Sequence, residues 1–340
     1  MSTSQPIEII GGGLAGLSLG LALRRAGVPV TLFEAGDYPR HRVCGEFIAG
    51  LAPTTAARLG LEPILAAALH HHEVAWFVPG HPPRIQHLPQ PALGLSRHAL
   101  DGRLAQAFRD AGGDLRVRSR VASPEPRPGR VLATGRRRAR SPWVGLKVHV
   151  LGLALERDLE LHLGDQAYVG LSRVEGGRVN VCGLFRRRPL SSAGAGLILA
   201  YLAAAGLADL AARLRAAAVD EDSLCAVAAV GFDRRVPCMG AMTLGDACAM
   251  VPPFTGNGMA MAFQSAELAL DPLVEFASGR LDWTSAGRLV HGSLRRHFRL
   301  RLASAHLLHP YLLQPGRQRW LAALNRAHLL PFKPLYAALH

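Results

Sequence analysis

The sequence predicts an α/β protein that begins with a Rossmann-like dinucleotide-binding unit, continues into an inserted mixed β-sheet and ends in helices. Three observations predict this class. Residues 7–34 run as a β-branched strand pattern, three glycines, an alanine-rich helix pattern and a second strand. Short strand patterns recur over residues 143–184. Amphipathic helix patterns fill the tail beyond Gly287.

The opening unit carries a G-x-G-x-x-G motif at Gly11, Gly13 and Gly16, directly before the helix pattern of residues 14–26. In this motif the first glycine makes the turn, the second lets the backbone approach a pyrophosphate, and the third lets helix and strand pack closely. Glu34 closes the second strand about 20 residues further on, where an acid can bond a ribose 2′-hydroxyl. The complete unit predicts a bound dinucleotide.

Length and composition set the broad class. With 340 residues, 49% of them hydrophobic, the chain can bury a large core, and we expect two closely packed domains. The lead 1–6 lacks the basic region of a signal peptide, and the five cysteines show no C-x-x-C spacing. We therefore expect a cytoplasmic protein with reduced thiols and no structural metal.

The net charge of +14 does not predict a nucleic-acid-binding protein. Arginine supplies almost all of the positive charge, since Lys147 and Lys333 are the only lysines, and no nucleic-acid-binding motif accompanies it. A positive field favours anionic partners, among them a dinucleotide, a CoA or carrier-protein thioester and an anionic membrane surface.

A loop rich in reactive residues follows Glu34. Arg40 and Arg42 are natural contacts for phosphate, and Cys44 and Glu46 place a thiol and a carboxylate on either side of a glycine. The alternative is an ordinary basic surface loop with one buried cysteine.

Periodicity predicts the elements between this loop and the second motif. Ser96 and Arg97 open one of the helices. We expect helices at 53–71, 97–111 and 194–218, strands at 73–78, 113–121, 130–133, 143–150, 159–163, 167–174 and 178–184, a proline- and histidine-rich loop at 79–91, and a solvated cationic loop at 136–140.

The second motif spans residues 242–270. A strand ends at Gly245-Asp246, and a proline-rich loop then leads through Gly256 and Gly258 into a long helix. Asp246 can accept hydrogen bonds from hydroxyls, and the N-terminus of the helix can stabilise negative charge on a cofactor. A proline–glycine loop that merely caps a helix is the alternative.

The tail carries Val290, Leu294, Phe298 and Leu302 on one helical stripe, with arginines elsewhere on the same helix. A break follows at Gln314-Pro-Gly. These helices either cover the core or form a basic amphipathic surface for a membrane or a carrier protein.

Taken in order, these parts resemble one family of FAD-dependent enzymes. This family contains geranylgeranyl reductases, aromatic hydroxylases of the para-hydroxybenzoate hydroxylase type and flavin halogenases. The matches are the first glycine motif with Glu34, the Arg-Val-Cys-Gly-Glu loop at 42–46, Ser96-Arg97, and the segment from Gly245-Asp246 to Pro252-Pro-x-x-Gly-Asn-Gly258. They span residues 7–270.

The resemblance implies a cofactor, a set of contacts and a domain layout. FAD would bind through its ADP half to Gly11, Gly13, Gly16 and Glu34, through its pyrophosphate and ribityl chain to Arg42, Arg97 and Asp246, and through its ring to Pro253, Gly256, Asn257 and Gly258. The FAD-binding domain, of glutathione reductase type, would comprise residues 1–72, 95–142 and 233–280, the substrate-binding sheet 73–94 and 143–232, and a C-terminal helical segment 281–340.

Where the chain departs from the family's sequence patterns, some of the family's activities become less favoured. The chain lacks the Trp-x-Trp-x-Ile-Pro segment of the halogenases, and residues 133–136 read Ala-Thr-Gly-Arg where the hydroxylases have Asp-Gly. We therefore expect an FAD-dependent reductase or dehydrogenase that acts on a hydrophobic small molecule, such as a prenyl or polyketide-like chain, by hydride transfer through flavin N5. Cys44 and Glu46 are the candidate proton donors, with His149 and Tyr168 as weaker candidates.

Other activities remain open from the sequence. One is an NAD(P)H-dependent flavin monooxygenase that hydroxylates an aromatic or polyketide substrate. A second is a flavoenzyme without net redox chemistry, and a third is an FAD-fold lipid carrier or interaction protein without enzyme activity. NAD(P)H as electron donor, a carrier- or CoA-bound substrate and peripheral membrane contact through the basic tail are likewise expectations.

Overall fold

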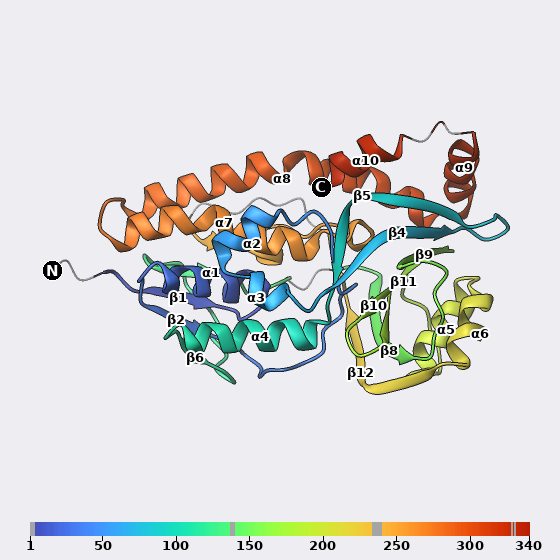
Figure 1. Ribbon diagram of the computed structural model, residues 1–340, viewed down its shortest axis with the longest axis horizontal. Coiled ribbons are helices and arrows are strands. Elements are labelled where there is room, and N and C mark those ends of the chain that lie inside the picture. Colours follow the sequence, from blue (N-terminus) through green and yellow to red (C-terminus); the bar gives the residue numbers. More distant parts are fainter. Residues whose placement is uncertain (1–3, 137–139, 233–239, 328, 330) are drawn as a thin grey trace.

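The computed structural model describes residues 4–136, 140–232, 240–327, 329 and 331–340. Two sheets organise this part of the chain, and they lie side by side along the long axis of the molecule (Figure 1). One edge of the molecule is formed by helices α8 (Trp283–Leu313), α10 (Phe332–Leu339) and α9 (Pro315–Arg326), and it lies opposite α4 (Arg97–Asp110). The α/β class with C-terminal helices is therefore as predicted.

The first sheet, here called the parallel sheet, forms the dinucleotide-binding unit. Its strand order within the described residues is β13-β7-β1-β2-β6, and each registered neighbour runs parallel. Helix α1 packs against α4 and α7, and their apolar residues share one buried core with Ile7, Ile9 and Leu32 of the sheet. The intervening strand residues Glu8, Thr31 and Arg130 are only half-buried. The strands are β1 (Ile7–Ile10), β2 (Val30–Phe33), β6 (Asp114–Arg116), β7 (Arg130–Leu132) and β13 (Met242–Thr243).

The glycines of the first motif pack as the motif requires. Gly11 has a φ of +110°, and a Cβ atom there would lie 2.2 Å from the carbonyl oxygen of Ala133. A Cβ atom at Gly16 would lie 2.0 Å from the carbonyl oxygen of Gly11. Larger residues would push helix α1 (Leu14–Arg25) away from the turn and from β7.

The second sheet, here called the mixed sheet, has the order β12-β8-β11-β10-β9-β4-β5-β3 among the described residues. Its pairs are antiparallel except for the parallel pair β4–β9. A hairpin connects β10 to β11 through Gly176 and Gly177, which both have positive φ. The strands are β3 (Phe47–Ile48), β4 (Leu69–Phe77), β5 (Arg84–Gly94), β8 (Trp143–Leu151), β9 (Leu159–Gly164), β10 (Ala167–Val174), β11 (Arg178–Arg186) and β12 (Ala218–Ala228).

Several predicted elements differ in the structure; the predicted strand 113–121, for example, covers only Asp114–Arg116. The predicted loop at 79–91 is mostly strand β5, whose prolines Pro89 and Pro91 lie where the register with β4 is interrupted and no ladder donor is needed. The predicted helix 53–71 is two short helices separated at Gly60; the second ends at Leu65, and β4 begins at Leu69. The predicted helix 194–218 is two helices, because the chain turns at Gly206, which has a φ of +77°.

The remaining helices cover the two sheets. Apolar residues of α8 such as Val290, Leu294 and Phe298 belong to the same buried core as α1 and α7. The predicted division into domains stays a prediction, and its boundary at 233 and part of the 136–140 loop lie outside the described residues. The helices are α2 (Pro53–Leu59), α3 (Glu62–Leu65), α4 (Arg97–Asp110), α5 (Gly196–Ala204), α6 (Ala208–Arg215), α7 (Gly258–Ala277), α8 (Trp283–Leu313), α9 (Pro315–Arg326) and α10 (Phe332–Leu339).

Candidate active site

A cavity of about 870 Å³ is lined by residues of both sheets and of the C-terminal helices. One end is formed by the turn after β1, the loop 40–45 and the turn before α7. The other end is formed by β4, β9, β10 and β11 together with α8, α9 and α10. The cavity is thus continuous from the predicted cofactor-binding motifs to the mixed sheet.

Two glycines form an open cradle at the first end. No heavy atom of the described residues lies within 4 Å of a Cβ atom built on Gly13 or on Gly258, and both residues line the cavity. Gly13 caps α1 and Gly258 begins α7, and no side chain caps either helix N-terminus. Two positive helix ends therefore meet the cavity, an arrangement that suits the phosphates and the electron-rich ring edge of FAD.

The arginines predicted to contact FAD lie together beside this cradle. Arg42 Nε donates to Asp101 Oδ2 at 2.8 Å, and Arg97 Nε donates to Asp101 Oδ1 at 2.7 Å. The buried Arg42 Nη2 has no hydrogen-bond partner among the described residues and lies 3.9 Å from Glu34 Oε2. Burial lowers the pKa of Arg42. A phosphate of FAD would supply the missing acceptor.

Asp246 also lines the cavity, and burial raises the pKa of its carboxyl group. Pro253 and Gly256 line the cavity, whereas Gly11, Gly16, Glu34 and Asn257 lie behind its wall. Gly11 and Gly16 therefore shape the turn. The Asn257 side-chain amide donates to the carbonyl oxygen of Leu339 in α10.

Glu34 stabilises the turn that contains the glycines of the first motif. Its carboxylate accepts hydrogen bonds from the backbone amides of Gly12 at 2.9 Å and Gly36 at 2.8 Å, and from Arg40 Nη2 at 2.6 Å. Both carboxylate oxygens of Glu34 thus already accept hydrogen bonds, and a ribose hydroxyl would share one of them.

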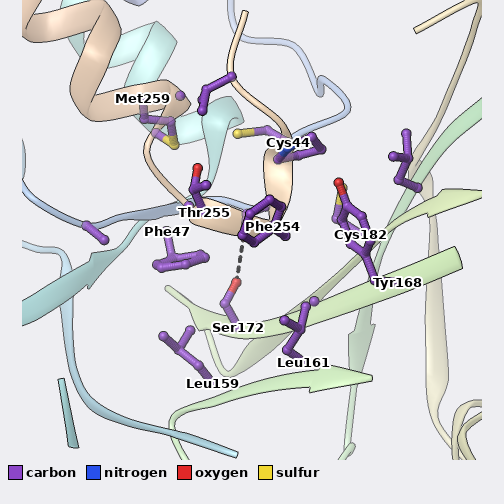
Figure 2. Close-up of a pocket in the computed structure, with 18 of the residues that line it drawn as sticks. Cys44, Phe47, Leu159, Leu161, Tyr168, Ser172, Cys182, Phe254, Thr255 and Met259 are labelled. Carbon is purple, nitrogen blue, oxygen red and sulfur yellow. Dashed lines mark hydrogen bonds between the residues drawn. The ribbon is translucent and has the colours of Figure 1, made fainter. Parts of the chain in front are cut away.

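The second end of the cavity is apolar. Figure 2 shows Phe47, Leu159, Leu161, Tyr168 and Phe254 gathered around it, and the thiols of Cys44 and Cys182 lie in the same view. Tyr168 is buried, and its hydroxyl lies 3.4 Å from His309 Nε2, a residue that the sequence analysis did not single out. This end suits a hydrophobic substrate.

The two candidate proton donors point in different directions. Cys44 lines the cavity, and burial raises the pKa of its thiol, so that the thiol stays protonated. Glu46 is fully buried with a φ of +55°, and its side chain is absent from the cavity wall. Its backbone amide donates to Cys44 Sγ at 3.4 Å.

The Glu46 carboxylate belongs to a buried cluster that the sequence analysis largely missed. Lys147 Nζ lies 3.4 Å from Glu46 Oε1, and His149 Nε2 lies 2.5 Å from Glu46 Oε2. The backbone amide of Arg97 also donates to Oε1, at 3.0 Å. The sequence does carry one signal, since Lys147 and His149 lie two apart on β8 and so share a face of the sheet.

His41 completes the cluster and connects it to the cavity, which it lines. Its Nδ1 lies 3.0 Å from Lys147 Nζ, and burial, followed by the charge of Lys147, lowers its pKa to about 4. Donor atoms of His41, Glu46 and His149 lie within 4.8 Å of one another, a spacing that a metal ion could use. The Lys147 ammonium contacts two of them and already supplies a positive charge there, so this donor set does not favour a metal.

Comparisons with known proteins concern the dinucleotide-binding unit and the fold. Residues 9–45 match the family of NAD(P)-binding Rossmann-like domains. A menaquinone reductase of Mycolicibacterium smegmatis is 26% identical over 132 residues, which cover 36% of this chain and 31% of that protein. The alignment thus spans less than a third of the reductase's length.

Solved structures share the fold over nearly the whole chain. The flavin-dependent brominase Bmp2 superposes with a TM-score of 0.75 at 16% identity, covering 98% of this chain and 92% of the brominase. PqsL of Pseudomonas aeruginosa, solved with 2-aminobenzoylacetate, gives a TM-score of 0.71 at 16% identity, over 92% and 97% of the two chains. The myxobacterial chondrochloren halogenase CndH gives 0.73 at 17% identity, over 97% and 92%. At these identities the likeness shows the fold alone.

Among the described helices, none combines the length and the apolar character needed to cross a membrane.

Proposed function

We propose that the chain is an FAD-dependent oxidoreductase that acts on a hydrophobic small molecule. The observation that carries this proposal is the continuous cavity, which joins the cradle of Gly13 and Gly258 to the apolar wall of the mixed sheet. The Rossmann-like match at residues 9–45 and the fold shared with flavin-dependent enzymes support it.

When bound, FAD supplies a two-electron carrier whose N5 atom exchanges hydride with a substrate. Arg42 and Arg97 would hold its pyrophosphate, and Asp246 would accept hydrogen bonds from its ribityl hydroxyls. The N-terminus of α7 at Gly258 would stabilise negative charge on the ring. The apolar wall excludes water from the place where a substrate would meet the ring.

We further propose a reductase of the geranylgeranyl reductase branch. The Arg-Val-Cys-Gly-Glu loop at 42–46 supports this branch. The likeness to a menaquinone reductase also favours reduction. The cavity wall, with Trp76, Leu161 and Leu312, suits a prenyl or polyketide-like chain.

Within this proposal Cys44 is the proton donor. A double bond that receives hydride at one carbon needs a proton at the other, and the Cys44 thiol is a protonated acid on the cavity wall. Glu46 is then a positioning residue, because its amide contacts Cys44 Sγ while its carboxylate is held by Lys147 and His149.

Replacing Cys44 with alanine is expected to lower the rate of substrate reduction by about 10²-fold, the usual contribution of a general acid. Because burial raises the pKa of Cys44, the wild-type rate should persist beyond the pH at which a free thiol ionises and then fall. The alanine variant should lose that alkaline limb. Single-turnover oxidation of the reduced protein by substrate, followed across pH, measures both.

The matched control is Cys248→Ala, a buried cysteine of the core that does not line the cavity. Its pH profile should equal that of the wild type. An unchanged rate and alkaline limb in Cys44→Ala would exclude the thiol as the donor.

A flavin monooxygenase is the second candidate, favoured by the fold shared with PqsL, described as a probable FAD-dependent monooxygenase. Anaerobic reduction of the yellow protein by NADH or NADPH, followed by admission of air, separates the two. A monooxygenase should bleach faster with substrate and then take up oxygen to give a hydroxylated product. A reductase should bleach slowly or not at all with NAD(P)H, use another electron donor and yield a reduced product without substrate-linked oxygen uptake.

A further inference from the structure

Helix α8 carries a second apolar stripe on its outward face. Leu289, Leu300 and Leu307 are 52%, 66% and 68% exposed, although leucines at neighbouring positions of the same helix are buried in the core. These residues are separated by eleven and seven positions, about three and two helical turns, so they lie in one line. Single exposed leucines are common, but a line of them is not.

The stripe continues from α8 to α9. Tyr311 follows Leu307 by one helical turn, and its ring centroid lies 6.0 Å from that of Trp320, which is 55% exposed. Arg317 stacks over Tyr311, with its guanidinium carbon 5.0 Å from the ring centroid. Figure 1 shows α8, α10 and α9 along one edge of the molecule. This edge therefore presents apolar and aromatic side chains at intervals along its length.

The same edge is strongly and exclusively basic. Residues 283–340 contain eight arginines and one lysine and no aspartate or glutamate. One arginine, Arg301, is buried. The others are exposed, and none of them forms an ion pair within the part of the chain that the structure describes; they are Arg288, Arg295, Arg296, Arg299, Arg317, Arg319, Arg326 and Lys333.

We infer that this edge, here called the α8–α9 face, docks onto the surface of an anionic lipid membrane. Exposed cations beside leucines and a tryptophan are the combination by which interfacial helices bind acidic headgroups and the acyl boundary. Nucleic acid would use the cations and leave the leucines in water. A second copy of the chain would bring two positive faces together in a two-fold contact.

The same helices line the cavity on their inner sides, so docking onto a membrane would bring the cavity close to the bilayer. Leu308 and Leu312 of α8, Leu321 of α9 and Leu335 of α10 line it. The helices that would contact the bilayer thus also form the wall of the apolar end. This second step rests on the proposed function: a hydrophobic substrate dissolved in the membrane would reach the cavity past these helices without crossing water.

The test measures binding of the full-length protein to lipid vesicles by co-sedimentation, without substrate or turnover. Vesicles of phosphatidylcholine alone are compared with vesicles that contain roughly one third phosphatidylglycerol. The wild type is expected to sediment with the anionic vesicles and to stay in the supernatant when only neutral vesicles are present. Because no activity is read, this result stands or fails independently of the proposed reaction.

Two sets of variants separate the apolar and the basic contributions. Leu300→Ser with Leu307→Ser should weaken binding at least tenfold, because two side chains no longer enter the acyl boundary. Arg295→Gln, Arg296→Gln and Arg299→Gln together should weaken it by about a hundredfold. All five positions are exposed, so folding should persist, as circular dichroism would confirm.

Matched controls come from surfaces away from the α8–α9 face. Leu69→Ser with Leu151→Ser removes two exposed leucines of the mixed sheet, and Arg109→Gln, Arg120→Gln and Arg215→Gln removes three exposed arginines. Both controls should bind vesicles like the wild type.

Three outcomes would overturn the inference. One is a wild type that does not bind the anionic vesicles. Another is binding that the leucine variants leave unchanged, which would show nonspecific attraction between charges. The third is a concentration-dependent dimer in gel filtration that the leucine variants abolish, which would identify a second copy as the partner.

Discussion

Replacing Lys147 with methionine is expected to lower the free energy of unfolding by about 3–5 kcal/mol, because the Glu46 carboxylate would stay buried without its cation. Both side chains are fully buried, with Lys147 Nζ 3.4 Å from Glu46 Oε1. Urea denaturation of the FAD-loaded protein at neutral pH, followed by circular dichroism, measures the change.

Two further variants show whether the effect belongs to the pair. Glu46→Gln alone should cost a similar amount, whereas the double variant should cost less than the sum of the single changes, since neither charge then remains. Lys333→Met is the matched control at an exposed position and should change stability by less than about 0.5 kcal/mol. A loss below about 1 kcal/mol in Lys147→Met would mean that the carboxylate is neutralised by His149 instead.

Replacing Gly13 with valine is expected to weaken FAD binding by at least a hundredfold and to give a colourless protein that is still folded. Gly13 has an extended backbone that valine adopts freely, and no heavy atom lies within 4 Å of the added Cβ. The new side chain would therefore leave the protein's packing intact and fill the space that the pyrophosphate requires. Absorbance near the flavin band and titration of the purified apoprotein with FAD give the affinity.

Gly287→Val is the matched control, because Gly287 also has no neighbour within 4 Å of an added Cβ but lies on α8, outside the cavity lining. It should bind FAD like the wild type. If Gly13→Val still bound one FAD per chain, the proposal that FAD binds at the glycine motif would be wrong. A wild type that cannot be loaded with FAD would favour the non-enzymatic carrier.

Local sequence patterns predicted the dinucleotide-binding unit well. Contacts between residues far apart in the sequence could not be predicted. The strand–glycine–helix–strand order of residues 7–34 depends on neighbours in sequence, so its glycines, helix and strands lie where the sequence places them. The partners of Glu46 could not be predicted, because Lys147 and His149 come from a strand one hundred residues further on. Strand β5 was missed because prolines argue against a strand, and only the interrupted register with β4 explains why they are tolerated.

The sequence also could not predict which way neighbouring side chains point within the site. The sequence placed Cys44 and Glu46 together as proton donors, since they flank one glycine. Only the positive φ of Glu46 shows that its side chain turns away from the cavity while Cys44 faces it. Adjacent residues in a loop can therefore have different roles, one at the cavity and one behind it.

The order of strands also has a consequence for how the protein is made. Strand β7 pairs with β13, and the cradle joins Gly13 to Gly258, so the parallel sheet and the cofactor cavity are complete only after the mixed sheet has been synthesised. Until α8 follows, a growing chain exposes the apolar ends of β9 and β10 together with unpaired strand edges. Such long-range pairing slows folding and favours aggregation during synthesis. Soluble yield should therefore depend on chaperones and on slow translation more than the stability of the finished fold would suggest.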